Sequence, residues 1–93
     1  MSTSTDHTAT PEAAAVRDNL IEFVRERTKT SVTEDLDLFG SGLVSSLFAM
    51  QLVVHVENSF GVSVAGPDLK LDNFRTVSAI TELVLRLRRG SGG

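Results

Sequence analysis

Apolar residues recur at helical spacing along residues 11–28, with charged residues between them. Intervals of three and four residues place the apolar side chains on one face of a helix. This face is formed by Ala13, Val16, Leu20, Phe23 and Val24. Thr10 is a suitable N-cap, Pro11 fits the first helical position, and Glu12 fits the first turn. We therefore predict an amphipathic helix from Pro11 to about Thr28.

A second helix is predicted from Ser46 to Phe60, because Gly61 is the residue type favoured just past a helix end. Its core face is formed by Ala49, Leu52, Val53, Val56 and Phe60. Further apolar side chains fall outside the centre of that face, namely Leu47, Phe48, Met50 and Val54. A helix that is apolar nearly all round is either buried by several neighbours or presents an apolar patch to a partner.

The last helix is predicted to begin after Thr76, a suitable N-cap, and to end at Arg88-Arg89. Its apolar face is formed by Val77, Ile80, Leu83, Val84 and Leu87. The basic residues at its end are favoured by the helix dipole.

Residues 61–75 join the second helix to the last one. Val62 and Val64 alternate with polar or small residues, but a lone strand would have nothing to pair with. The Gly-Pro pair at 66–67 is a turn signal. We predict a loop here, followed by a short helical turn around residues 71–74.

Residues 29–45 form a long connection between the first two helices. It contains apolar residues that need burial, namely Leu36, Leu38, Phe39 and Leu43. A loop of this length in so small a domain is often functional. The predicted fold class is all-α, a small four-helix bundle of three main helices and one short helix. We assign residues 10–89 to this domain, with a disordered tail over 1–9 and a flexible tail over 90–93.

The chain has 93 residues, enough for one modest core, and contains no Cys. Disulfides and thiolate metal sites are therefore excluded, which fits an intracellular protein. The net charge is −3 with no basic stripe, which argues against nucleic-acid binding. No apolar run approaches the roughly 20 residues of a membrane span, and the first ten residues do not resemble a secretory signal. We expect a cytoplasmic protein that binds neither nucleic acid nor membrane.

The sequence contains no convincing set of catalytic or metal-ligating residues. His55 is the only histidine within the predicted helices, and it lies about 14 Å along the helix axis from Ser46, on the opposite side. His55 and Glu57 point in different directions, so they make a poor metal site. Asp35 and Asp37 are more typical of solvated loop acids than of cation ligands. We therefore expect a protein that is not an enzyme.

Two adjacent serines, Ser45 and Ser46, stand at the start of the second helix. Either hydroxyl could cap the helix and do nothing more. Alternatively, Ser46 is an attachment point, since a long glycine-containing loop delivers it to a rigid helix end that another enzyme could reach. The N-terminus of a helix favours an anion such as a phosphate. On spacing alone, both interpretations stay open.

This part of the sequence resembles the acyl carrier protein family, whose motif is Asp-Ser-Leu at the start of its second helix. The matching segments are Leu38-Phe39, Gly42-Leu43, Ser46-Leu47, Phe60-Gly61-Val62 and Thr76-Val77. The resemblance covers roughly residues 11–88. It implies that Ser46 carries 4′-phosphopantetheine, added from coenzyme A by a phosphopantetheinyl transferase. The thiol of this arm would hold an acyl group as a thioester, which would explain why the chain needs no Cys of its own.

The chain departs from this family at two places. Ser45 stands where the family usually has Asp, which puts loading efficiency in doubt. The second helix has Glu57 as its only acid, whereas carrier proteins commonly dock through acidic residues there. The resemblance places docking on this helix, through Leu47, Phe48, Gln51, Val54 and His55. We expect a monomer whose docking is more apolar and less sensitive to salt.

The stretch GLVSSLFAMQLV, residues 42–53, looks most similar to discrete carriers of polyketide pathways that supply unusual extender or starter units. Glyceryl and methoxymalonyl units are examples, and such pathways often make antibiotics. The partners implied are an acyl-loading enzyme, modifying enzymes, and an acyltransferase or ketosynthase. A peptidyl or aminoacyl carrier of a nonribosomal pathway is the nearest alternative. An unmodified helical interaction module is a third, in which Ser46 would have no special role.

Overall fold

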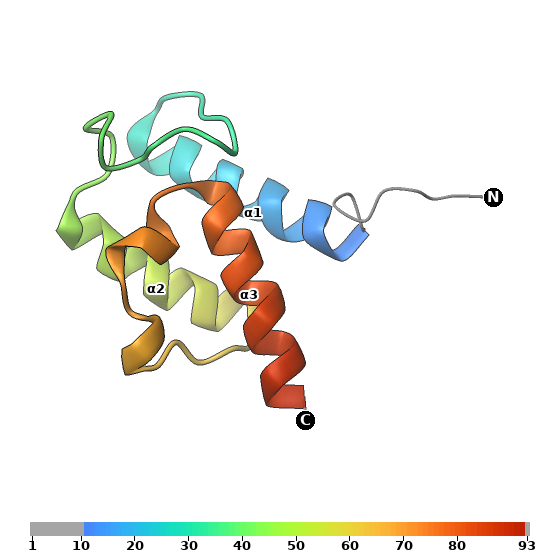
Figure 1. Cartoon of the computed structure of the whole chain (residues 1–93). Coiled ribbons are helices and arrows are strands. Elements are labelled where there is room, and N and C mark those ends of the chain that lie inside the picture. The colour runs from blue at the N-terminus through green and yellow to red at the C-terminus, as the bar shows by residue number, and fades with distance from the viewer. Residues whose placement is uncertain (1–10, 93) are drawn as a thin grey trace.

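The computed structural model describes residues 11–92, and these form an all-helical domain (Figure 1). Its elements are α1 (Pro11–Thr28), α2 (Ser46–Phe60), η1 (Gly66–Asp68), η2 (Leu71–Phe74) and α3 (Val77–Gly92). The elements η1 and η2 are short 3₁₀ helices. The all-α prediction is therefore confirmed, with three main helices, short helical turns between α2 and α3, and a long loop between α1 and α2.

The bounds of α1 and α2 agree with the helical periodicity of the sequence, and the predicted short turn at 71–74 is η2. Val62 and Val64 lie in a loop, as expected, while the turn at Gly66 was not predicted to be helical. Helix α3 continues to Gly92, past the Arg89 at which the sequence pattern ended it. The predicted disordered tail over 1–9, the N-cap at Thr10 and the last residue lie outside the described residues.

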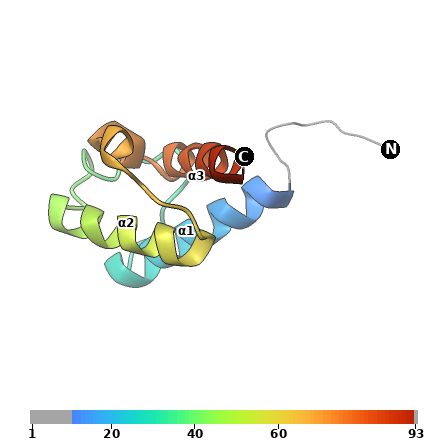
Figure 2. The same ribbon diagram turned by 90° about the horizontal axis from the view of Figure 1, so that it is seen from below.

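One core is shared by all three main helices. The side chains of Leu20 from α1, Leu52 and Val56 from α2, and Ile80 and Val84 from α3 are fully buried. Figure 2 shows α1 and α2 on one side of the molecule, with η2 and α3 on the other. Burial of this apolar surface is the main driving force for folding of so small a domain.

The long loop takes part in this core. Leu38 and Val44 from the loop are buried, as is Val32 near its start. Leu36, Phe39 and Leu43 are partly buried and pack against the core. The loop is thus held across the bundle, as its apolar residues predicted.

Helix α2 ends at Gly61, which adopts the left-handed conformation with φ of 67°. Its N–H donates to the carbonyl of Glu57 at 3.0 Å. Glycine is favoured at this position because its missing Cβ removes the steric penalty for positive φ. The side chain of Glu57 accepts the backbone N–H of Val64 at 2.9 Å, so the acid of α2 also fixes the loop that follows.

The outer face of α2 is exposed. The side chains of Leu47, Met50 and Val54 are 75%, 57% and 54% exposed. Of the two explanations for a helix that is apolar nearly all round, an exposed apolar patch is therefore the one observed. Within residues 11–92, none of the helices combines the length and apolar character that crossing a bilayer requires.

Candidate functional site

Ser45 and Ser46 have different roles at the start of α2. Ser45 is the N-cap, with an extended backbone, and its hydroxyl oxygen accepts the N–H of Phe48 at 3.2 Å. Ser46 is the first residue of the helix and is exposed. Among residues 11–92, no partner within hydrogen-bond distance is found for the Ser46 hydroxyl. The cap is thus supplied by one serine, and the hydroxyl of the other is available for chemistry.

The surroundings of Ser46 favour a negatively charged group. The first turn of α2 contains no acidic residue. The N-terminal turn of a helix has N–H groups without helical partners and the positive end of the helix dipole. A phosphodiester at this point would meet these donors and no like charge from the first turn of α2.

The loop that leads to Ser46 is held to the bundle by backbone hydrogen bonds. The N–H of Leu38 donates to the carbonyl of Arg75 at 2.8 Å, and the N–H of Val44 donates to the carbonyl of Leu38 at 3.0 Å. Both bonds involve Leu38, whose side chain is fully buried. Gly42, between Leu38 and Val44 in the sequence, has a φ of 83°, a conformation that residues with a Cβ rarely adopt. The start of α2 is therefore positioned by a folded loop.

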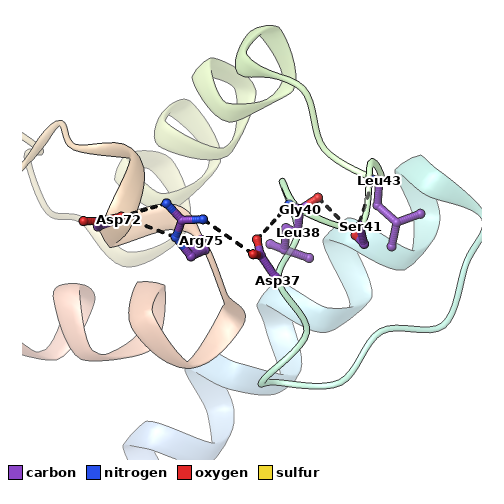
Figure 3. Close-up of polar contacts among 7 residues, drawn as sticks. All are labelled: Asp37, Leu38, Gly40, Ser41, Leu43, Asp72 and Arg75. Atoms are coloured by element: carbon purple, nitrogen blue, oxygen red, sulfur yellow. Dashed lines mark hydrogen bonds and ion pairs between the residues drawn. The ribbon is translucent and has the colours of Figure 1, made fainter.

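Ion pairs add to this arrangement (Figure 3). The guanidinium of Arg75 contacts Asp37 of the loop at 3.5 Å and Asp72 of η2 at 2.9 Å. Asp37 also accepts the backbone N–H of Gly40 at 2.8 Å. This bond from Gly40 and, less strongly, the charge of Arg75 hold the pKa of Asp37 below its ordinary value. The predicted loop acid Asp37 thus has a structural role, since it ties the loop to η2.

The residues predicted to form the docking surface lie in two groups on α2, one on its outer face and one beside α1. Leu47 and Val54 are exposed as predicted. Met50, which was placed outside the core face but not among the docking residues, lies between them and is also exposed. Leu69, just after η1, and Leu71, the first residue of η2, are also exposed and were not predicted. Helical spacing of three and four residues from Leu47 through Met50 to Val54 places Met50 on this face, but nothing in the sequence pointed to the two leucines.

The other three predicted docking residues are turned toward α1. The ring of Phe23 stacks on His55, with centroids 3.9 Å apart, and on Phe48 at 5.8 Å. Gln51 is exposed, and its side-chain oxygen accepts a hydrogen bond from Arg27 at 2.9 Å. Docking through Phe48, Gln51 and His55 therefore stays a prediction, and the structure adds that these side chains also contact α1. They form the edge at which α2 packs against α1.

His55 is a packing residue in this structure. Besides the stack on Phe23, its Nε2 forms a hydrogen bond with Asn19 Oδ1 at 2.6 Å. Its partial burial and, secondly, the positive charge of Arg27 lower the pKa of His55 below its ordinary value. In the described part of the chain, no three His, Cys, Asp or Glu side chains gather where they could hold a metal ion.

A hollow in the described part of the chain lies away from Ser46. It is a groove between α1 and α3, about 600 Å³ in volume, bordered by charged side chains. Several of these pair with one another, Arg17 with Glu34 at 3.3 Å and Arg88 with Glu12 at 2.8 Å. The groove shares no residue with the start of α2, so we place no substrate chemistry there.

Comparison with known proteins finds one matching protein family and several similar carrier proteins. The protein family described as "Phosphopantetheine attachment site" matches residues 18–84, a segment that contains the long loop, all of α2 and the first half of α3. The chain is also similar to the D-alanyl carrier proteins of Streptococcus sanguinis and Streptococcus gordonii. It is 31% and 32% identical to them over 75 residues, which cover 78% of this chain and 95% of each relative. The D-alanyl carrier protein of Streptococcus mutans is 27% identical over the same length.

Proposed function

Because the chain belongs to the phosphopantetheine-attachment family of carrier proteins, we propose that Ser46 is the residue that carries its cofactor. The cofactor of this family is covalently attached 4′-phosphopantetheine. The domain itself is a carrier and not a catalyst. Its partners are therefore a phosphopantetheinyl transferase and the enzymes that handle the acyl group.

The observation that supports Ser46 is the division of roles between the two serines. Ser45 is engaged in capping through the N–H of Phe48, and replacing its hydroxyl would cost the helix its cap. Ser46 is exposed at the first position of α2, directly after the loop anchored by Leu38. A residue that is to be modified by a second protein must be reachable and rigidly presented, and Ser46 meets both conditions.

The loading step is a phosphoryl-type transfer. The Ser46 oxygen attacks the phosphorus that bears the pantetheine group of coenzyme A, and a new P–O bond forms. The bond from this phosphorus to the oxygen of the second phosphate breaks, which releases 3′,5′-adenosine bisphosphate. The serine proton passes to a base of the transferase. The thiol of the arm then takes up an acyl group as a thioester, and the carrier raises the local concentration of that group at each enzyme.

We further propose that the cargo belongs to a polyketide pathway of the kind that builds unusual extender or starter units. Two features support this role, the stretch GLVSSLFAMQLV with Ser45 in place of an acid, and the apolar outer face of α2. Docking would use Leu47, Met50 and Val54 against apolar surfaces of an acyltransferase, a ketosynthase or modifying enzymes.

An aminoacyl cargo is the second candidate, and a specific observation favours it. Relatives that match 78% of this chain include D-alanyl carrier proteins. The two candidates differ in the enzyme that charges the arm. An ATP-dependent ligase that adenylates D-alanine would charge an aminoacyl carrier, whereas an acyltransferase using a malonyl-type thioester would charge the other.

The first experiment is intact-protein mass spectrometry after incubation with coenzyme A and a broad-specificity phosphopantetheinyl transferase. Wild type and Ser45→Ala should each gain the mass of one phosphopantetheinyl group, and Ser46→Ala should gain none. A gain that persists in Ser46→Ala would overturn the assignment. If several transferases load neither protein, the unmodified interaction module becomes the better description. The holo protein is then incubated separately with the ligase and with the acyltransferase, and the mass gained in each case shows which cargo it accepts.

A further inference from the structure

Arg27, in the last turn of α1, has only neutral partners. Its guanidinium donates to the Gln51 side-chain oxygen at 2.9 Å and lies 4.8 Å from the centre of the Phe23 ring. Within residues 11–92, no carboxylate forms an ion pair with Arg27. Ion pairs with carboxylates are formed by Arg17, Arg25, Arg75, Arg86 and Arg88, whereas Arg89, Lys29 and Lys70 resemble Arg27 in forming none within the described residues. Arg27 therefore presents an uncompensated positive charge in a protein whose net charge is −3.

A shallow hollow of about 230 Å³ lies beside this guanidinium. It is lined by Arg27, Thr28, Gly42, Leu43 and Phe48. The side chains of Leu43 and Phe48 are half-buried, so the hollow has apolar walls and a cationic edge.

Two residues that line the hollow flank the proposed attachment site in the sequence. Leu43 precedes Ser46 by three residues, and Phe48 follows it by two. Figures 1 and 2 show the last turn of α1 and the first turn of α2 at the same end of the molecule. An arm attached to Ser46 and folded around the start of α2 would bring its cargo to this end.

We propose that the hollow is a seat for a carboxylate at the free end of the acyl group, with Arg27 as its partner. This inference rests on the proposed attachment at Ser46. A guanidinium bonds a carboxylate through two parallel N–H donors, which is stronger than its bond to the neutral amide of Gln51. The carbon chain of the acyl group would lie against Leu43 and Phe48.

The seat selects between the two classes of cargo considered above. A malonyl-type acyl group ends in a carboxylate, which Arg27 attracts. An aminoacyl group ends in an ammonium, which Arg27 repels. The local charge therefore favours an acyl group that bears a carboxylate over one that bears an amine.

The test uses the full chain, loaded by a broad-specificity transferase from malonyl-, acetyl- and β-alanyl-coenzyme A. The NMR signals observed are the side-chain N–H of Arg27 and the methyl groups of Leu43. We expect the malonyl form to shift both signals relative to the acetyl form, and the β-alanyl form to shift neither. Raising the ionic strength to about 1 M, where the Debye length is roughly 3 Å, should shrink the malonyl-specific shift.

Variants separate this seat from general effects of loading. Arg27→Gln should lose the malonyl-specific shift at Leu43, while Arg27→Lys should keep part of it. Arg25→Gln is the matched control, because Arg25 is already paired with Glu22, and it should behave as wild type. Identical malonyl and acetyl spectra, or a malonyl shift that survives in Arg27→Gln, would refute the seat and leave attachment at Ser46 intact. Absence of any mass gain would instead refute the attachment, and the seat with it.

Discussion

Arg75 and Asp37 lie 38 residues apart in the chain, yet their side chains meet at 3.5 Å. The pair stands next to the backbone bond from Leu38 to the carbonyl of Arg75. Together these contacts join the loop before α2 to the segment before α3 (Figure 3). The segment that presents Ser46 is therefore coupled to the segment that enters α3.

Arg75→Gln should loosen the loop more than it destabilises the fold. Exposed ion pairs contribute only about 0–1 kcal/mol, and the Arg75 side chain is 44% exposed. We expect a small loss in urea denaturation together with faster amide hydrogen exchange over residues 37–44. Arg86→Gln is the control, because it removes a pair with Asp68 that lies away from the loop. Equal exchange rates over 37–44 in the two variants would show that the Arg75 pair does not hold the loop.

Leu38→Ala should be strongly destabilising although Leu38 lies in a loop. Its side chain is fully buried, and truncation of a buried leucine typically costs about 2–5 kcal/mol. Leu47→Ala removes the same atoms from an exposed position and should change the free energy of unfolding by less than about 0.5 kcal/mol. Chemical denaturation of both variants checks the difference. Similar losses would mean that the loop is not part of the core.

Ser45→Ala should lower the free energy of unfolding by about 1 kcal/mol, because it removes the cap on the Phe48 N–H. Ser45→Asp should keep the cap, since a carboxylate accepts the same bond. Ser46→Ala should be close to neutral in the same urea titrations. If Ser46→Ala were the more damaging change, the roles of the two serines would have to be exchanged.

Stability should fall between neutral and mildly acidic pH through His55. Burial and the charge of Arg27 lower the pKa of His55 in the folded protein. The unfolded chain therefore binds the proton more tightly. The stabilising contribution is complete above the ordinary pKa of about 6.5 and is lost as pH falls through the folded pKa.

Denaturation of wild type and His55→Gln across this pH range measures the effect. The variant loses the stack on Phe23, so its stability should be lower at every pH. Its stability should nevertheless depend less on pH than that of wild type. The same pH dependence in both proteins would assign the titration to another group.

Much of this fold follows from local patterns in the sequence. The spacing of Leu20 and Val24, or of Leu52 and Val56, identifies a buried helix face without knowledge of the neighbours. Gly61 marks the end of α2 because its conformation is a local requirement. The short turn η2 was also predicted from the sequence.

The rest depends on contacts between distant segments. Whether Ser45 or Ser46 caps α2 depends on the backbone angles at the helix start, which two adjacent serines do not reveal. Phe48 and His55 were assigned to the docking face because the position of Phe23 against α2 could not be known. The partner of Asp37 was hidden for the same reason, because Arg75 belongs to another segment.

The capping of α2 by Ser45 separates two tasks that one hydroxyl could have combined. If Ser46 held the helix end, each round of esterification would compete with folding. Since it does not, the proposed apo and holo forms should melt at nearly the same temperature. Such a carrier could be synthesised, stored and loaded in any order, with its folded state indifferent to whether the arm is present.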